Sequence, residues 1–353
     1  MTFGLRMGMV TIGLIVFFLA IGTLQRPPVE SIQRGYRGLG MVELYHPATL
    51  LAEENANRIP EASPKQDPTG QLASQVYSNV QVLKDVDAGE FIRLMTDITA
   101  WVSPQQGCGY CHAEGEDLGS DKLYTKVVSR RMIEMTRHIN ADWQKHVGET
   151  GVTCFTCHRG QPVPNNVWFS DPGPTASQGA AGNHAGQNAP TAAVGLTSLP
   201  YDPFTPFINN DGDPRVISTT ALPEGNRHSI KQTEWTYAFM MHISKALGVN
   251  CTFCHNSRSF TAWDQSTPQR ATTWYGIRMT RDLNANYLEG LSAQFPHHRL
   301  GPLGDVPKIN CATCHQGVYK PLFGVSMLKD YPELRGPRAP TATPAPAPPG
   351  STR

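Results

Sequence analysis

Cys108-Gly109-Tyr110-Cys111-His112 is the first of four copies of the pattern Cys-x-x-Cys-His in a chain of 353 residues. The other copies are Cys154-Phe155-Thr156-Cys157-His158, Cys251-Thr252-Phe253-Cys254-His255 and Cys311-Ala312-Thr313-Cys314-His315. On one helical turn the two cysteines and the histidine of such a motif lie on the same face. Both thiols can then bond to the vinyl groups of a porphyrin while the histidine coordinates its iron, as in c-type haem. The sequence therefore predicts four covalently bound haems.

The placement of the cysteines distinguishes this interpretation from a zinc or disulfide framework, which also uses Cys-x-x-Cys pairs. All 8 cysteines fall inside the four motifs, and a histidine follows the second cysteine each time. The predicted haem-binding cysteines are Cys108, Cys111, Cys154, Cys157, Cys251, Cys254, Cys311 and Cys314. The predicted first axial ligands are His112, His158, His255 and His315.

The composition predicts a mainly α-helical fold with much irregular loop. Hydrophobic residues make up 39% of the chain, and Gly (32) and Pro (29) are numerous, so the haems are expected to form much of the core. A net charge of +1 argues against nucleic acid as a partner. Each haem adds two propionates, so the loaded protein should be acidic, and a basic soluble electron carrier would suit it as a partner.

The N-terminal segment predicts an uncleaved membrane helix. Residues 7–24 are uncharged and apolar, and at about 1.5 Å per residue they reach roughly 27 Å, enough for a bilayer core. A cleaved signal peptide is the alternative, with Ala20-Ile21-Gly22 as its processing site, but the apolar run is longer than a typical signal core. No cysteine precedes Cys108, which argues against a lipoprotein anchor. Because c-type haem is attached outside the bacterial cytoplasm, the chain from about residue 25 onward is expected in the periplasm.

The remaining chain is predicted to contain two similar halves, each binding two haems. An amphipathic helix precedes each haem motif, with helices expected at 90–101, 127–143, 234–247 and 272–287. The stretches Met135-Thr136-Arg137-His138-Ile139-Asn140-Ala141 and Met279-Thr280-Arg281-Asp282-Leu283-Asn284-Ala285 are closely similar, which indicates internal duplication. The expected segments are a membrane anchor at 1–28, an extended arm with one short helix at 29–70, a two-haem half at 71–160, a low-complexity insertion at 161–200, a second two-haem half at 201–325 and a Pro-rich tail at 326–353.

Each iron also needs a sixth ligand, and methionine gives a higher potential than a second histidine. Met95 and Met240 lie on helices before the first and third motifs. The second haem has two candidates, Met132 and Met135, which align with Gly276 and Met279 in the other half. If Met132 is the ligand, the fourth haem lacks a methionine and needs a histidine from elsewhere. Eight histidines lie outside the motifs, namely His46, His138, His146, His184, His228, His242, His297 and His298.

Of these histidines, His146 has the most favourable spacing. It follows Met132 by four helical turns, so one long helix could ligate two haems, one at each end. For a lone histidine the simpler explanation is an exposed or hydrogen-bonded side chain, and for Met95, Met132 and Met240 it is core packing.

The chain resembles the tetrahaem cytochrome subunit of the photosynthetic reaction centre of phototrophic bacteria. The likeness extends over most of residues 35–325, and the stretches that carry it are Gly35-Tyr36-Arg37-Gly38-Leu39, His46-Pro47-Ala48-Thr49, Trp101-Val102-Ser103-Pro104-Gln105, Gly151-Val152-Thr153-Cys154, Gly248-Val249-Asn250-Cys251 and Thr267-Pro268-Gln269-Arg270. The resemblance implies methionine ligation of three haems, through Met95, Met132 and Met240, and bis-histidine ligation of the fourth through His315 and His146. It further implies a row of haems perpendicular to the membrane, with the third-motif haem nearest the special pair of bacteriochlorophylls and the first-motif haem farthest out. Arg270 matches an arginine that would raise the potential of that inner haem.

The function that follows is an electron-transfer subunit and not an enzyme. It would take electrons from a soluble periplasmic cytochrome c or high-potential iron–sulfur protein and pass them to the membrane subunits of the reaction centre, on the periplasmic side of the inner, photosynthetic membrane. The main alternative is a membrane-anchored tetrahaem quinol dehydrogenase, whose haem motifs are more crowded and whose ligands are mostly histidine. A catalytic multihaem reductase would need an iron with an open site, whereas a sixth ligand can be named for all four.

Overall fold

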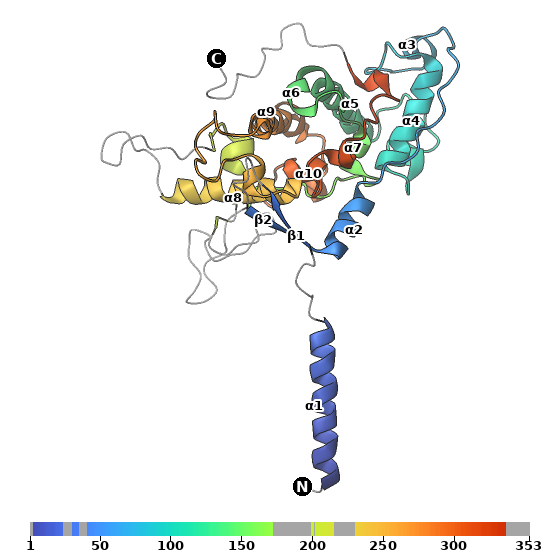
Figure 1. Ribbon diagram of the computed structural model, residues 1–353. Coiled ribbons are helices and arrows are strands. Elements are labelled where there is room, and N and C mark those ends of the chain that lie inside the picture. The colour runs from blue at the N-terminus through green and yellow to red at the C-terminus, as the bar shows by residue number, and fades with distance from the viewer. Residues whose placement is uncertain are drawn as a thin grey trace.

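The computed structural model (Figure 1) describes residues 3–23, 30–34, 41–171, 199–200, 202–214 and 230–336. Most of the predicted insertion at 161–200 and of the tail beyond 336 lies outside these residues, as do His184 and His228. The described chain is mainly helical and its helices are joined by irregular loops (Figure 1), as the composition predicts.

The N-terminal helix α1 spans Phe3–Thr23. Large apolar side chains along it are exposed, with 58% of Val10, 57% of Phe17 and 66% of Phe18 accessible. Within the ranges given above, no helix combines the length and the apolar character needed to cross a membrane. The membrane anchor therefore stays a prediction.

The predicted arm contains more regular structure than the sequence suggests. Strands β1 (Glu30–Arg34) and β2 (Met41–Tyr45) form an antiparallel hairpin, in register from Glu30 opposite Tyr45 to Arg34 opposite Met41. Helix α2 (Pro47–Ala56) follows, and the His46 side chain accepts a hydrogen bond from the backbone N–H of Ala48 at its start.

Four longer helices form the body of the molecule and confirm the four helices predicted before the haem motifs. They are α4 (Ala88–Val102), α5 (Tyr124–Asp142), α8 (Ile230–Leu247) and α9 (Pro268–Leu283). Helix α4 shows how local sequence sets such bounds. The Asp87 carboxylate accepts from the N–H of Gly89 at its start, and Pro104 follows its last residue by two positions, where a helix cannot continue.

Short helical segments connect the long helices. They comprise α3 (Ala73–Val76), α6 (Gln144–Val147), α7 (Cys154–His158), α10 (Cys311–His315), the 3₁₀ turns Gly107–Tyr110, Cys251–Phe253, Glu289–Leu291, His297–Arg299, Pro321–Gly324 and Pro332–Leu334, and the π turns Thr205–Asn209 and Asn284–Leu288.

Instead of one large core, the described residues form three larger hydrophobic clusters and a small fourth one at Leu199 and Ala238. The first gathers around α4 with Leu94, Trp101 and Leu334, the second around α8 with Phe239 and Ile208, and the third lies between α5 and α9. Side chains that partly cover these clusters include the candidate ligands Met95, Met132 and Met240. The clusters are small because a large cavity, described below, occupies the space between the helices.

Asn140 of α5 and Asn284, the residue directly after α9, occupy corresponding positions and make the same hydrogen bonds. The Asn140 side chain donates to the carbonyl of Val152 and accepts from its N–H, at 2.9 and 2.8 Å. The Asn284 side chain does the same with Ile309, at 3.0 and 2.9 Å. Val152 and Ile309 each stand two residues before the first cysteine of a haem motif. Each buried asparagine thus fixes one motif to the helix that precedes it.

Candidate haem sites

The second and fourth motifs form short helices with the same capping. The N–H of Thr153 donates to the hydroxyl of Thr156 at the start of α7, and the N–H of Asn310 donates to the hydroxyl of Thr313 at the start of α10, both at 3.0 Å. Each helix ends at a residue with φ of 48°, Arg159 and Gln316, in the left-handed region. A single turn of this kind is the geometry that places both cysteines and the histidine on one face.

The first and third motifs are wound more tightly. Their cysteines lie in the 3₁₀ turns Gly107–Tyr110 and Cys251–Phe253. In both, the histidine N–H still closes a full helical turn, from His112 to the Cys108 carbonyl and from His255 to the Cys251 carbonyl, at 2.9 Å. The motifs therefore fall into two structural pairs, first with third and second with fourth.

All four motif histidines make the same contact through Nδ1. His112, His158, His255 and His315 lie within hydrogen-bonding distance of a backbone carbonyl, that of Leu118, Gln161, Phe260 and Val318 respectively, at 2.8–3.1 Å. A carbonyl only accepts, so Nδ1 must carry the proton and Nε2 keeps its lone pair. This is the arrangement that metal-coordinating histidines adopt, with the second nitrogen fixed by an outer partner.

Three of the four motifs line one cavity of about 1050 Å³. Ligand pockets in proteins commonly range from roughly 300 to 1,000 Å³, so this one exceeds the usual size. The cysteines and histidines of the first, second and fourth motifs line it, together with Met95, Met132, Met135, Met279 and His146. The residues present therefore fit several large apolar cofactors. Cys251, Cys254, His255 and Met240 do not line this cavity.

The His146 side chain lies against helix α9 at Gly276, where the helix has no side chain, and approaches the fourth motif there. Its ring centroid lies 6.0 Å from that of His315, and metal–imidazole bonds are about 2.0–2.1 Å long, so one iron can lie between the two rings. The Nδ1 atom of His146 lies 2.9 Å from the Thr272 carbonyl, which leaves its Nε2 for coordination as in the motif histidines.

The missing side chain at Gly276 provides the space for the His146 ring. A Cβ atom added at Gly276 would lie 2.5–3.1 Å from three ring atoms of His146, closer than real Cβ atoms approach a neighbour. Gly276 aligns with Met132 of α5. The helix without a methionine at this position is therefore the one that has room for a histidine.

The structure corrects one detail of the sequence argument for His146. Met132 and His146 do not belong to one continuous helix, because α5 ends at Asp142 and His146 lies in the separate turn α6. Trp143 stands between the two helices, with φ −104° and ψ 28°. Four regular helical turns would have placed His146 on the face of Met132, and the break instead directs it to α9.

The environment of the histidines favours the neutral form that binds metal. Burial lowers the pKa of His315 to about 4, with His146 adding to the effect. Burial likewise lowers the pKa values of His146 and His158. In the same way, burial raises the pKa values of the Cys154 and Cys311 thiols to about 12, as expected for sulfur atoms that face an apolar space.

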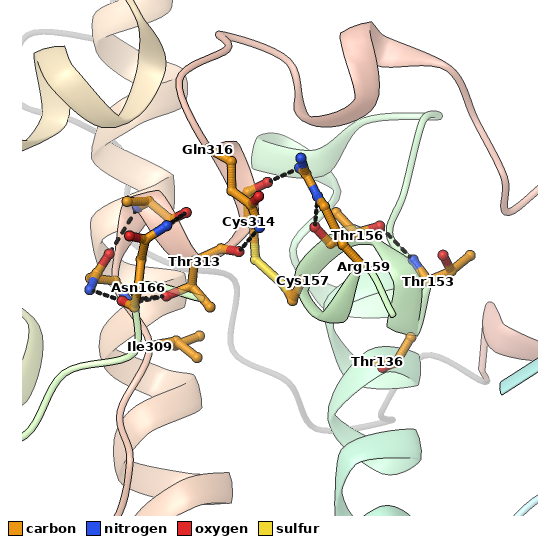
Figure 2. The surroundings of a disulfide bond; sticks show 12 residues. Thr136, Thr153, Thr156, Cys157, Arg159, Asn166, Ile309, Thr313, Cys314 and Gln316 are labelled. Atoms are coloured by element: carbon orange, nitrogen blue, oxygen red, sulfur yellow. Dashed lines mark hydrogen bonds between the residues drawn. A yellow bond between two sulfur atoms is a disulfide. The ribbon is translucent and has the colours of Figure 1, made fainter. Parts of the chain in front are cut away.

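A disulfide joins Cys157 to Cys314, with their Cα atoms 4.5 Å apart (Figure 2). A sulfur atom in a disulfide cannot also form a thioether, so this bond and the predicted haem attachment are alternatives at these two cysteines. The Arg159 side chain supports the contact by donating to the Cys314 carbonyl at 2.8 Å (Figure 2). The second and fourth motifs therefore lie next to each other.

Arg270 lies beside the third motif. Its guanidinium donates to the Ala262 carbonyl and the Ser266 hydroxyl, at 3.0 and 2.7 Å, and stacks on the Trp263 ring. Burial lowers the pKa of His255, and the charge of Arg270 acts in the same direction against the Nδ1 contact to Phe260. The predicted tuning residue is thus placed where its charge acts on the third site.

Several residues of the sites were not found from the sequence. The four carbonyls that accept from the motif histidines are backbone groups, and a backbone group leaves no trace in a residue pattern. Asn140 and Asn284 did carry a signal, because both stand at the same position of the two similar stretches. Lys126, which is buried beside the first motif, gave no such signal.

Comparison with known proteins identifies the family. A sequence model described as "Photosynthetic reaction centre cytochrome C subunit" matches residues 25–335. The chain belongs to this family. It is an electron carrier with covalently attached c-type haem and not an enzyme.

Individual relatives agree with this family assignment. The photosynthetic reaction center cytochrome c subunit of Rubrivivax gelatinosus is 53% identical over 336 residues, which cover 95% of this chain and 91% of that protein. That of Thermochromatium tepidum is 51% identical over 308 residues, covering 87% and 76%. Cytochrome c-554 of Chloroflexus aurantiacus is more distant, at 27% identity over 73% of both chains. Membership of this family confirms the predicted electron-transfer role and disfavours the quinol dehydrogenase alternative.

Proposed function

We propose that this chain passes single electrons through four haems, from a soluble periplasmic donor to the photo-oxidised special pair of the reaction centre. The haem iron supplies the one-electron chemistry, and the protein sets the position and potential of each haem. The observation that carries the proposal is the arrangement of the motifs, which are linked one after another by contacts of the motifs or of residues beside them. The donor would be a cytochrome c or a high-potential iron–sulfur protein.

The contacts between motifs support the order third, fourth, second, first. Phe253 of the third motif packs against Tyr319, which follows the fourth, with ring centroids 4.6 Å apart. Cys314 of the fourth motif contacts Cys157 of the second. After the second motif, the N–H of Gly160 donates to the carbonyl of Trp101 on α4, the helix before the first motif. The family resemblance implies that the third-motif haem is the one nearest the special pair, so electrons would enter at the first-motif haem and leave at the third.

The proposed iron ligands follow from the same sites. The eight motif cysteines would form the thioethers, so Cys157 and Cys314 would each bond to a haem instead of to each other. The proposed axial pairs are His112 with Met95, His158 with Met132, His255 with Met240 and His315 with His146. Gly276 favours Met132 over Met135 as the ligand of the second haem, because Met279, the counterpart of Met135, is present in the half that uses His146.

Two features of the chain outside the haem sites belong to the proposal. Helix α1, with its exposed apolar side chains, would anchor the chain in the photosynthetic membrane and hold the haems on the periplasmic side. The two halves would derive from duplication, which the equivalent bonds of Asn140 and Asn284 support. Retention of the chain in membranes washed at high salt, and its release when residues 3–23 are deleted, would test the anchor.

Flash-induced absorbance changes in native membranes test the electron path. After a short light pulse we expect oxidation of a high-potential haem together with re-reduction of the special pair. Replacing Cys251 and Cys254 by alanine should abolish that fast phase, because the innermost haem is removed. The matched replacement of Cys108 and Cys111 should leave the fast phase and slow only the later delivery of electrons. The proposed path would be refuted if the flash caused no haem oxidation. It would also be refuted if the fast phase were lost on replacement of the first-motif cysteines and kept on replacement of the third-motif cysteines.

A further inference from the structure

A buried lysine contacts the carbonyl group that holds the first motif histidine. Lys126 lies in the first turn of α5, and its side chain is only 9% accessible. Its ammonium group donates to the carbonyl of Leu118 and, at 2.9 Å, to that of Ser120. The same Leu118 carbonyl accepts from Nδ1 of His112 at 2.9 Å. One carbonyl oxygen is therefore shared by the predicted iron ligand and by a fixed positive charge.

We propose that Lys126 raises the reduction potential of the iron that His112 coordinates. The inference rests on the proposed function, since it requires a haem at the first motif. Lys126 would act through Leu118 and through its charge, without contacting the iron.

Two effects of Lys126 act in the same direction. A carbonyl that accepts from Nδ1 of a metal-bound histidine makes the imidazole a stronger donor, which stabilises the oxidised iron. An ammonium group on the same oxygen draws electron density away from that hydrogen bond and so weakens the electron donation of the imidazole to the iron. In addition, a buried cation near the haem disfavours the form with the greater positive charge, which is the oxidised one.

The charge of Lys126 is not cancelled by its neighbours. The nearest carboxylate, Asp121, lies 3.7 Å away but is 40% accessible and has a shorter ion pair of 2.7 Å with Arg130. Asp117 also acts on Lys126, and its own carboxylate is exposed and hydrogen-bonded by Ser78. Two cations, with side chains 9% and 13% accessible, thus share one close carboxylate, and Lys126 is the one that donates to the Leu118 carbonyl.

The cations near the other motifs donate elsewhere. His158, His255 and His315 contact the carbonyls of Gln161, Phe260 and Val318, whereas Arg159 donates to the Cys314 carbonyl and Arg270 to that of Ala262. Lys126 therefore distinguishes the first haem from the others and offers a means of setting its potential separately.

Redox titration of the haem-loaded complex, followed at the haem absorption bands, tests the inference. Lys126→Gln keeps an amide that can donate to both carbonyls and removes the charge. It should lower the potential of the first haem by at least 59 mV, a tenfold change in its reduction equilibrium, and leave the other three in place. Lys126→Arg should restore most of the loss. A Met95→His variant identifies the first-haem wave independently.

The matched control is Lys122→Gln, which removes the same charge four residues earlier, just before α5 begins. Lys122 is 65% accessible and pairs with Glu116, so solvent screens it and its loss should shift the first haem far less. An unchanged first-haem potential in Lys126→Gln would overturn the inference, as would equal shifts for both lysines. If Lys126→Gln lost the first haem altogether, Lys126→Arg would be the decisive variant. A first-haem potential in Lys126→Arg well below that of the wild type would then overturn the inference. A wild-type protein without a first-motif haem would instead refute the proposed function.

Discussion

Helices α5 and α9 are built alike but present different side chains to the haem cavity. Each places a buried asparagine against the segment before its motif, and each carries a threonine, Thr136 or Thr280, that donates to the carbonyl four residues earlier. They differ where α5 carries Met132 and α9 carries Gly276. The absence of a side chain at Gly276 admits His146 from the other half. With the proposed ligands, a single difference at this position, Met132 or Gly276, would exchange methionine for histidine at one iron and so change its potential.

The largest effect is expected from removing the two unlike ligands. His146→Ala should leave the fourth iron without its sixth ligand and convert that haem alone to a high-spin spectrum. Met132→Ala should do the same to the second haem. Electron paramagnetic resonance of the oxidised protein would show each change, with His297→Ala, at an exposed position that neither lines the cavity nor belongs to the proposed ligand set, as the control. If either variant kept all four low-spin signals, the ligand assignment at that haem would be wrong.

A smaller effect is expected from filling the space at Gly276 of α9. The Cβ of Gly276→Ala would meet the His146 ring, and the resulting overpacking should destabilise the protein by about 1–3 kcal/mol and weaken the low-spin signal of the fourth haem. Gly290→Ala is the matched control, since a Cβ there meets nothing within 4 Å. The spectrum and the denaturant midpoint report the two effects. A variant at Gly276 with the wild-type spectrum would show that the ring does not need this space.

The similarity of the halves can be tested through the two asparagines. Asn140→Ala and Asn284→Ala each leave a buried N–H and carbonyls without partners, so each should lower the free energy of unfolding by about 2–4 kcal/mol. Chemical denaturation of the loaded protein measures this loss, and Asn286→Ala, at an exposed site, should change it far less. A large loss in one half and none in the other would contradict an equivalent role.

The smallest expected effect is on the pH dependence of stability, through the contact between His138 and Asp282. His138 and Asp282 hold corresponding positions on α5 and α9 and lie 2.7 Å apart. Hydrogen bonds to Asp282 and Asp142 raise the pKa of His138 despite its burial, so the charged histidine stabilises the folded state. That contribution is complete below the pKa of an unfolded histidine, about 6.5, and disappears as the pH rises through the higher folded value.

Replacement of His138 tests this pH dependence. His138→Gln should lower the melting temperature most at about pH 6 and very little well above the folded pKa. Melting curves across this range measure the difference between variant and wild type. A difference that grows as the pH rises would have the wrong sign for a stabilising imidazolium.

Most of the helical framework could be predicted from the sequence. Apolar residues at helical spacing marked α4, α5, α8 and α9, and the Cys-x-x-Cys-His pattern marked the cofactor, because both signals lie in consecutive residues. The alignment that paired Met132 with Gly276 came from the repeated stretch between Met135 and Ala141. What it could not reveal was the break at Trp143, where tertiary contacts override a helical pattern.

Other features depended on contacts between distant parts of the chain. The hairpin Glu30–Tyr45 has Gly35, Gly38 and Gly40 between its strands, and those glycines indicated a loop-rich arm instead. The contact of Cys157 with Cys314 joins residues 157 positions apart. Lys126 stands just before the predicted helix at 127–143, and only the folded chain shows that its side chain is buried and donates to the Leu118 carbonyl.

We propose that three irons have histidine and methionine ligands and that the fourth has two histidines. Near-infrared magnetic circular dichroism of the oxidised, purified protein tests this ligand set directly, because the ligand pair sets the energy of the charge-transfer band. We expect bands of both classes, with the bis-histidine band lost in His146→Ala and the methionine bands retained. A spectrum in which all four haems share one ligand pair, or a bis-histidine band that survives the loss of His146, would contradict it.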